Sequence, residues 1–455
     1  MITIFNEKEH IMSSNPTKRI EEIDRRLEEL PKGTLTYKKI NGKEQPYIQR
    51  TIDGKSVSYY VKLSERERVL VEFEERTKLQ EEKRHLTAYV EGLKDILKHN
   101  PYLSAKVVIG YQDFEDFTCG QQFYVDKTHF ITEWLREGTK ITLITRPRRF
   151  GKTTLLSTVR LFFDPRYADH SEYFDKLRVW QDERSRSMFG STPVISTSFG
   201  GCKGIDYKQS IRGMMGQLRT MYGHHEYLLD SPRLSDRDKE LFKETKCAFF
   251  NNDTSYIENS IRYLCELLYK HFGVKPIVLI DEYDTPLIEA YTDGYWDEMI
   301  TTCRQLFHNT LKENDYLGRA IITGVTKVSK NSLFYDLNNL LVATVTDDIY
   351  TDCCGFTEQE VMDALKCQNM CQSVDQMQEV KKMYDGFIFG SHKDIYNPWS
   401  IVNYMKERLL RSYWILTSSN KLIGDIICRH PYDKKYEIEE LIEGKKVHKV
   451  INENI

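Results

Sequence analysis

The hydrophobic and polar positions of the first hundred residues predict a helical hairpin that carries a small β-sheet. Apolar side chains recur at helical spacing over residues 16–30 and again over the longer, highly charged stretch 65–97. Three segments between these helices alternate apolar and polar residues as strands do: 34–40, 45–52 and 55–62. Because Asn-Gly and Asp-Gly dipeptides separate the segments, we expect a three-stranded meander at the tip of a coiled-coil hairpin.

From residue 107 the pattern changes to apolar strands that alternate with amphipathic helices. The predicted strands are 140–145, 193–199, 276–281 and 319–325. Helical patterns lie between them, for example over residues 211–222. This alternation is typical of an α/β protein whose mostly parallel sheet is covered on both faces. In such a sheet, ligands bind at the carboxyl ends of the strands.

The composition fits an ordered protein with several domains. The 455 residues carry 65 lysines and arginines against 68 acids, which argues against general coating of nucleic acid but allows a local basic patch. No apolar run reaches the roughly 18–20 residues of a membrane helix, and no signal peptide is recognisable, so we expect a cytoplasmic location. The codons ahead of Met12 can form a ribosome-binding sequence, and we expect translation to start there.

The ten cysteines are scattered and are expected to be reduced thiols. A zinc site is not expected, because adjacent cysteines without a second Cys-x-x-Cys pair are poor zinc spacing. The four cysteines considered are Cys353, Cys354, Cys367 and Cys371.

A phosphate-binding loop is predicted after the strand at 140–145. The loop ends in Gly151-Lys152-Thr153, and a helical pattern follows. The N–H groups and the dipole at a helix start both favour phosphate, so Lys152 is expected to reach the β- and γ-phosphates and Thr153 to ligate Mg²⁺. The usual pattern has a glycine five residues before Gly151, where this chain has Arg146, and the tripeptide alone is a weak signal.

Two later strands end in residues that complete such a site. Asp281 and Glu282 follow an apolar run, which places them beside the phosphate loop in a parallel sheet. Asp281 is predicted to hold the Mg²⁺ shell, and Glu282 to orient and deprotonate the attacking water. Thr323, at the tip of the strand 319–325, is expected either to contact the γ-phosphate or that water, or to satisfy a loop amide.

With these residues in place, the chain resembles the AAA-ATPase-like family of bacterial P-loop proteins, which is related to STAND and archaeal ATPases. The motifs that carry the resemblance are Tyr124-Val125-Asp126-Lys127-Thr128, Arg146 to Thr153, Asp281 to Pro286, Ile322 to Val325, Asn338-Asn339-Leu340, Gly355-Phe356-Thr357, Tyr384 to Phe387, Tyr396 to Ser400 and Tyr413-Trp414. The resemblance implies ATP and Mg²⁺ as ligands and a variant loop with arginine at position 146. It also implies an added strand between the phosphate strand and the Asp-Glu strand.

Nucleotide contacts are expected along the whole arginine-rich loop. The predicted residues are Arg146, Arg148, Arg149, Phe150, Gly151, Lys152, Thr153 and Thr154. One arginine is expected to neutralise charge in the transition state, in cis or in a neighbouring subunit, and another to pair with an acid such as Asp126 or Asp284 and brace the loop. The sequence does not assign which arginine has which role.

The resemblance also implies a division of the chain into parts. We expect a hairpin with a β tip at 1–100, a P-loop ATPase core at 101–349, a helical or winged-helix-like region at 350–425 and a charged segment at 426–455. Residues 387–397 are predicted to form a hairpin wing. Family members commonly continue into a PD-(D/E)XK nuclease-like domain. We find no strand-borne Asp…Glu-x-Lys set here, so DNA cleavage is not expected. We expect either a truncated family member or an effector that a partner supplies.

Two functions remain open from the sequence. The preferred one is Mg²⁺-dependent ATP binding with slow hydrolysis, as a nucleotide-driven switch that acts on a protein partner or in a homo-oligomer, in a mobile-element or defence setting. The alternative is a module that binds DNA or RNA and uses its nucleotide site for structure or regulation. That alternative rests on the basic tip, where Tyr37, Tyr47, Tyr59 and Tyr60 interleave with lysines and arginines. The competing interpretation of the tip is a solvated sheet face whose tyrosines pack on the helices.

Overall fold

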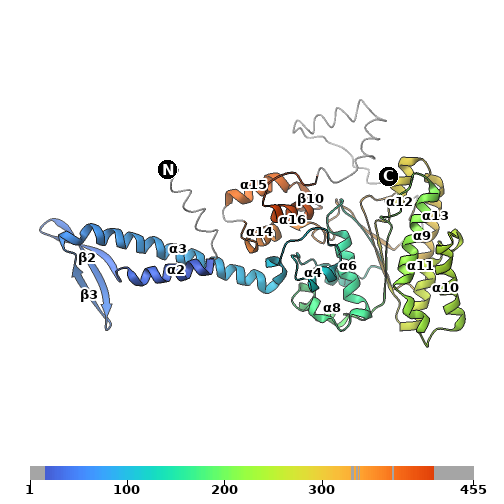
Figure 1. Ribbon diagram of the computed structural model, residues 1–455, viewed down its shortest axis with the longest axis horizontal. Helices are drawn as coiled ribbons and strands as arrows, with labels where there is room; N and C mark the ends of the chain where they lie inside the picture. The colour runs from blue at the N-terminus through green and yellow to red at the C-terminus, as the bar shows by residue number, and fades with distance from the viewer. Residues whose placement is uncertain (1–15, 329–332, 335–336, 338, 371–373, 415–455) are drawn as a thin grey trace, which may run out of the picture. The chain divides into compact units, whose positions relative to one another are not determined.

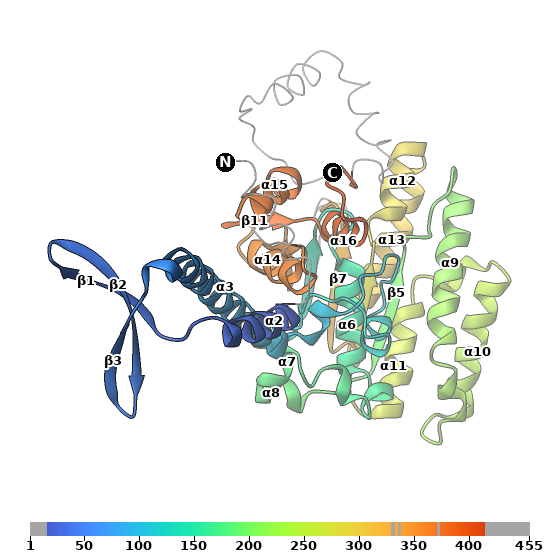
Figure 2. The same ribbon diagram turned by 60° about the vertical axis from the view of Figure 1, so that its left-hand side comes forward.

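The structure is a computed structural model that describes residues 16–328, 333–334, 337, 339–370 and 374–414. The chain divides into two compact units, Met1–Lys98 and His99–Ile455. Figures 1 and 2 show their helices and strands. The expected start at Met12, the cysteine at 371 and the charged segment 426–455 lie outside the described residues.

The first unit is a two-helix hairpin that carries a three-stranded antiparallel sheet, as the hydrophobic pattern predicts. Its elements are α2 (Pro16–Glu29), β1 (Thr34–Ile40), β2 (Lys43–Ile52), β3 (Lys55–Tyr60) and α3 (Arg66–His99), and a short 3₁₀ turn (Leu63–Glu65) precedes α3. The strands pair in the order β1-β2-β3. Asn41 and Asp53 each adopt a φ of 47°, the left-handed conformation that tight turns of this kind require.

The two helices of this unit are connected by ion pairs, and the sheet is anchored on α3. Arg19 bonds Glu82 at 2.8 Å, and Arg26 bonds Glu75 at 2.7 Å. A small apolar cluster fixes the base of the sheet: Val61, Val69 and Phe73, with Leu35 and Ile48 packed against them. Since solvent screens these partly exposed ion pairs, the apolar contacts are the stronger stabilising term.

Three of the four tip tyrosines are exposed. The exposed fractions are 55% for Tyr37, 47% for Tyr59 and 50% for Tyr60, while Tyr47 is half-buried. About half of each of these three residues is therefore solvated, and packing of the tyrosines on the helices stays a prediction. The apolar contact of the sheet with α3 is made by Leu35 and Ile48, while Arg66 of α3 donates to the Tyr60 hydroxyl.

The second unit is built on a five-stranded parallel sheet. Its strands are β4 (Ile141–Thr145), β5 (Val194–Ser198), β6 (Ile277–Asp281), β7 (Arg319–Gly324) and β8 (Leu340–Ala343). They lie in the order β5-β6-β7-β4-β8, and every pairing is parallel. The added strand β7 thus lies between the phosphate strand β4 and the acid strand β6. This sheet is consistent with a P-loop fold.

Helices cover both faces of this sheet (Figure 1). They are α4 (Phe114–Cys119), α5 (His129–Glu137), α6 (Lys152–Phe163), α7 (Arg178–Gln181), α8 (Glu183–Ser187), α9 (Tyr207–Gly223), α10 (Asp236–Phe250), α11 (Ser260–Phe272), α12 (Thr285–Asp293) and α13 (Trp296–Leu311). Alternate strand residues enter different apolar clusters: Leu143 packs with the α9, α11 and α13 side, and Ile144 with the α5 and α6 side. Because both faces of the sheet are buried, the strand sequences are continuous apolar runs.

A smaller α/β region follows β8. Its elements are β9 (Phe356–Thr357), α14 (Glu358–Cys367), α15 (Val374–Tyr384), β10 (Phe387–Phe389), β11 (His392–Tyr396) and α16 (Pro398–Glu407). The strands pair antiparallel in the order β10-β11-β9, so the hairpin expected at 387–397 is present. Asn397 caps α16 through its side chain, and Pro398 occupies the first turn. The winged-helix-like character of this region stays a prediction.

Candidate functional site

The loop between β4 and α6 bends sharply before the helix begins. Gly151 has a φ of 88° and directly precedes Lys152, the first residue of α6. A Cβ at Gly151 would meet no atom within 4 Å, so glycine is required here by backbone conformation and not by space. The first N–H groups of a helix have no partner inside it. Here Gly151 to Thr154 line a cavity, which makes this helix start accessible to an anion.

Lys152 is buried and is bonded to its own loop. Its side chain is 6% exposed, and Nζ donates to the carbonyl oxygens of Arg146 at 2.9 Å and Pro147 at 3.0 Å. Within the described residues, no carboxylate lies within ion-pair distance of this ammonium. Burial lowers the pKa of Lys152, although the nearby acids oppose that shift. A phosphate in the cavity would supply the missing negative charge.

Thr153 and Thr323 both donate to Asp281 and join two distant parts of the chain. Thr153 Oγ1 donates to Oδ2 at 2.5 Å, and Thr323 Oγ1 donates to Oδ1 at 2.5 Å. Asp281 is 5% exposed and Thr323 is fully buried, so this carboxylate is held in one orientation. A hydroxyl and a carboxylate oxygen side by side are the donor set that Mg²⁺ binds beside phosphates. The residues present therefore fit the predicted metal position.

Glu282 lies at the cavity with an unusual backbone. Its φ of 49° is in the left-handed region, which is uncommon for a residue other than glycine, and its N–H donates to Asp281 Oδ1 at 2.9 Å. The carboxylate accepts from Thr285 Oγ1 at 3.2 Å. It also lies against Gly200, where an added Cβ would come within 2.3 Å of Oε2. Strain of this kind concentrates at functional sites, and here it directs Glu282 into the cavity.

Arg146 is fully buried and bonds main-chain carbonyls. Its guanidinium donates to Ala343 O at 2.9 Å, Thr344 O at 2.7 Å and Tyr350 O at 2.8 Å, and it lies 4.9 Å from the centre of the Phe389 ring. The side chain therefore connects the phosphate loop to the segment after β8. In this structure it does not line the cavity, and a nucleotide contact from Arg146 stays a prediction.

The acids expected to pair with a loop arginine have other partners. Asp126 accepts from the N–H and hydroxyl of Thr128 and from the main-chain N–H of Arg178. Asp284 is buried and accepts from Thr326 and from the N–H of Val325, which holds the segment after β7 in place. Burial raises the pKa of Asp284. An arginine–acid pair was one expectation for how the loop is held in place. The structure shows instead that Arg146 holds it through hydrogen bonds to carbonyl oxygens.

The remaining loop residues contact or face the small region after β8. Phe150 is buried and packs edge-on against Phe387 at 4.8 Å, and its carbonyl accepts from the N–H of Gly355. Arg149 has a φ of 68°, and its guanidinium lies 4.1 Å from the centre of the Trp399 ring. Arg148 and Arg149 both line the cavity. The small region after β8 therefore contacts the phosphate loop directly.

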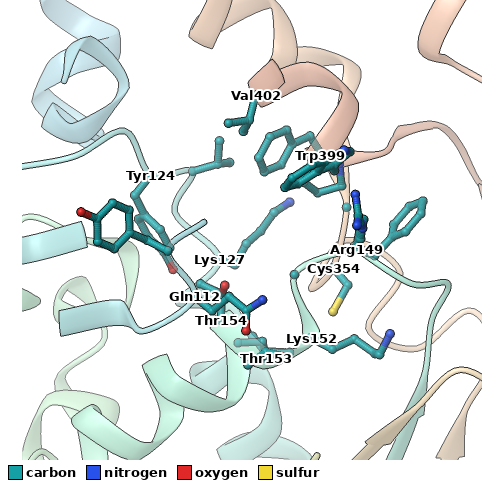
Figure 3. A pocket seen from close by; sticks show the side chains of 18 of the residues that line it. Gln112, Tyr124, Lys127, Arg149, Lys152, Thr153, Thr154, Cys354, Trp399 and Val402 are labelled. Atoms are coloured by element: carbon teal, nitrogen blue, oxygen red, sulfur yellow. The ribbon is translucent and has the colours of Figure 1, made fainter. Parts of the chain in front are cut away.

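The cavity has a volume of about 580 Å³, the size of a small-molecule site. Its walls come mainly from residues 108–112, 123–125 and 127, from the loop 148–155, from 353–356 and from α16. Figure 3 shows Trp399 and Val402 on the opposite side of the cavity from Thr153 and Thr154. One end therefore presents the helix start and Lys152, and the other presents an aromatic ring, an arrangement suited to a phosphate chain and a planar base.

Several cavity residues had no predicted role. Lys203, in the loop after β5, lines the cavity, and nothing in its sequence context indicates this. Lys127 also lines it, while its Nζ bonds Glu360 at 2.5 Å and the carbonyl of Asp352 at 2.8 Å. Cys354 lies at the cavity too, where a hydrogen bond from Cys353 and nearby cations lower its pKa. Trp399 was part of a recognised motif, but its place opposite the phosphate loop depends on the tertiary structure.

One further group of side chains has the spacing of metal ligands. Ligand atoms of His129, Glu133 and Asp352 lie within 4.8 Å of one another. His129 Nε2 is 3.2 Å from Asp352 Oδ1, and this contact lowers the pKa of Asp352 against the opposing effect of burial. Among the described residues, no group of this kind includes a cysteine.

Comparisons with known proteins match the part of the chain that contains these residues to a protein family. The model of a family described as Predicted AAA-ATPase matches residues 108–334, which include the phosphate loop, the acid strand and β7. The description of this family names an ATPase. A protein of Azotobacter chroococcum mcd 1, described as an uncharacterized protein in the vnfD 5′ region, is 29% identical over 327 residues. These residues cover 71% of this chain and 56% of that protein, so the chain spans little more than half of its relative. No solved structure matches the chain.

Within the part of the chain that the structure describes, no helix combines the length and the apolar character needed to span a bilayer. The longest described helix, α3, is rich in charged residues along its whole length.

Proposed function

We propose that this protein binds Mg²⁺–ATP in the cavity between the β4–α6 loop and α16 and hydrolyses it slowly, as a nucleotide-driven switch. The observation that carries the proposal is the hydrogen bond between Thr153 and Asp281. It lies at the start of α6, where Lys152 also lines the cavity. This bond brings the predicted metal ligands from β6 and α6 within one hydrogen bond of each other.

The residues would share the work as follows. The N–H groups at the start of α6 and the Lys152 ammonium bind the β- and γ-phosphates. Thr153 and Asp281 hold Mg²⁺, which when bound neutralises charge on the phosphate oxygens. Glu282 orients the attacking water and accepts its proton. Thr323 keeps Asp281 in position, and Arg148 or Arg149 is placed to neutralise charge on the phosphates.

Calorimetry tests the proposal directly. Wild-type protein is expected to bind ATP in the presence of Mg²⁺, and Lys152→Ala to lose that affinity. Lys140→Ala, which removes a lysine before β4, is the matched control and should bind normally. Glu282→Gln should still bind ATP but lose turnover by at least roughly 100-fold, the usual contribution of a general base. Absence of measurable ATP affinity in the wild type would end the proposal.

A switch role is supported by the contacts between the loop and the region after β8. Phe150, Arg146 and Arg149 each contact that region, so a change at the phosphates is transmitted to it without an intervening linker. We expect hydrogen exchange in β10, β11 and α16 to slow when ATP and Mg²⁺ are added to Glu282→Gln. The same protein without nucleotide is the reference, and unchanged exchange would argue against a switch. A second copy of the chain or a protein partner would respond to this change.

A further inference from the structure

One face of the small sheet in the first unit is polar, basic and free of acids. The strand register decides which residues share it, because partners across the strands and every second residue lie on the same face. Thr36, Tyr47 and Tyr60 form one rung of this face. The complete set, called here the Tyr60 face, is Thr34, Thr36, Lys38, Ile40, Lys43, Gln45, Tyr47, Gln49, Thr51, Ser56, Ser58 and Tyr60.

The opposite face makes the apolar contact with α3. Leu35, Ile48 and Tyr59 form the neighbouring rung, and Leu35 and Ile48 pack on Val69 and Phe73 of the helix. The Tyr60 face is therefore directed away from this apolar contact. Lys38, Lys43, Gln49 and Tyr60 on it are all exposed.

Cations and aromatic rings are arranged together on the Tyr60 face. Lys38 Nζ lies 4.8 Å from the centre of the Tyr47 ring, and Tyr47 contacts Tyr60 edge-on at 5.5 Å. Arg66, at the start of α3, reaches the same face, where it donates to Gln45 and to the Tyr60 hydroxyl. The rings are thus preorganised, with half of the Tyr60 side chain accessible to a ligand.

The charge of the tip differs from that of the chain as a whole. Residues 32–62 contain seven lysines and arginines against two acids, Glu44 and Asp53, while the whole chain has slightly more acids than bases. Neither acid belongs to the Tyr60 face: Glu44 lies on the opposite face, and Asp53 lies in the β2–β3 turn. Lysines, hydroxyls and amides without a carboxylate are the groups that bind phosphodiesters.

We propose that the Tyr60 face binds the phosphodiester backbone of a nucleic acid. The lysines neutralise phosphates, the hydroxyl and amide groups donate to phosphate oxygens, and the Tyr60 ring contacts a sugar or base. An acidic protein surface is the competing partner, but the hydroxyl and amide groups and the exposed aromatic ring beside the lysines favour a nucleic acid. This proposal does not depend on ATP binding in the second unit.

The test measures fluorescence anisotropy of labelled duplex DNA, single-stranded DNA and single-stranded RNA with the full-length chain. Binding to at least one of the three is expected, and comparison of the three identifies the nucleic acid. The affinity should fall steeply between about 50 and 200 mM KCl, because phosphate contacts release counterions. No binding to any of the three at low salt would overturn the proposal.

A pair of charge-matched variants separates the Tyr60 face from the general charge of the tip. Lys38→Gln/Lys43→Gln removes two lysines from this face, and Lys39→Gln/Lys55→Gln removes two from the opposite one. The first should weaken binding by roughly tenfold or more and lower the salt slope by about two, whereas the second should change binding by less than about threefold. Equal losses in both, or equally tight binding of polyglutamate as competitor, would overturn the proposal. ATP affinity measured on the same samples should be unchanged in both variants.

Discussion

Thr323 Oγ1 donates to Oδ1 of Asp281 over 2.5 Å, while the other oxygen of the same carboxylate accepts from Thr153. The sequence suggested three roles for Thr323: contact with the γ-phosphate, contact with the attacking water, or satisfaction of a loop amide. The structure shows a different contact, in which Thr323 fixes the carboxylate predicted to hold Mg²⁺. Because Thr323 is fully buried, its hydroxyl has little freedom to reach another partner.

Replacement of Thr323 should therefore affect the metal more than the nucleotide. Thr323→Val keeps the shape but removes one hydrogen bond to Asp281, worth about 1 kcal/mol or somewhat more. We expect a several-fold higher Mg²⁺ concentration at half-maximal ATPase activity, with little change in metal-free nucleotide binding. Thr323→Ser retains the hydroxyl and should behave as wild type. A Mg²⁺ dependence unchanged in Thr323→Val would show that the bond does not position Asp281.

Gly200 offers a way to displace Glu282 without changing it. An added Cβ at Gly200 would lie 2.3 Å from Glu282 Oε2, so Gly200→Ala must move the carboxylate. Turnover should fall by roughly tenfold or more, as expected when a general base is moved, while ATP affinity is retained. Gly201→Ala is the matched control, because its Cβ would meet only the end of the Gln217 side chain. If both variants lose turnover equally, displacement of Glu282 does not explain the loss, and its role as the general base is not supported.

Alanine variants of Arg146 and Arg148 should have different effects, the first on the free energy of unfolding and the second on ATP affinity. Arg146→Ala leaves the carbonyl oxygens of Ala343, Thr344 and Tyr350 without their buried donor. We expect a loss of about 3 kcal/mol or more in the free energy of unfolding, measured by urea denaturation. Arg148→Ala should unfold like wild type but bind ATP more weakly, because Arg148 lines the cavity. An unchanged unfolding midpoint in Arg146→Ala would contradict the bracing role.

Trp399 should report nucleotide binding by its fluorescence. The ring lines the cavity and contacts the Arg149 guanidinium, so a ligand there changes its surroundings. ATP is expected to change the intrinsic fluorescence of wild-type protein, and Trp399→Phe should remove most of that change. Trp296→Phe, which alters a tryptophan in α13, should retain it. A full signal in Trp399→Phe would place the base elsewhere.

The buried imidazole of His225 should lower the free energy of unfolding as the pH falls into the mildly acidic range. Burial and the nearby Arg166 lower the pKa of His225 to about 3, from about 6.5 in an unfolded chain. The unfolded state therefore binds a proton that the folded state does not, and stability is lost as the pH falls below 6.5 toward 3. Between pH 7 and 5 this loss amounts to about 2 kcal/mol. Urea denaturation of His225→Gln should show a smaller loss over this interval, whereas His170→Gln, which alters an exposed histidine, should match wild type.

Local signals determined much of the fold. The Gly151-Lys152-Thr153 loop between an apolar strand and a helix, and the Asn-Gly and Asp-Gly turns of the meander, are formed by residues adjacent in the chain. The strands that end at Asp281 and Thr323 were also predictable, because a parallel sheet brings their carboxyl ends to one edge. The sequence by itself thus determined the sheet, the Gly151-Lys152-Thr153 loop and the position of the acids beside it.

Only the tertiary structure decided which distant groups these parts contact. Arg146 bonds carbonyl oxygens about 200 residues away, at Ala343 and Tyr350, and carbonyl groups have no side-chain signal in a sequence. The far wall of the cavity likewise depends on how α16 folds back toward the loop, which places Trp399 beside Arg149. At the tip, only the pairing of the strands shows that Tyr47 and Tyr60 lie on one face together with Lys38. In each case the deciding interaction joins groups distant along the chain, and their positions are fixed only when the whole unit packs.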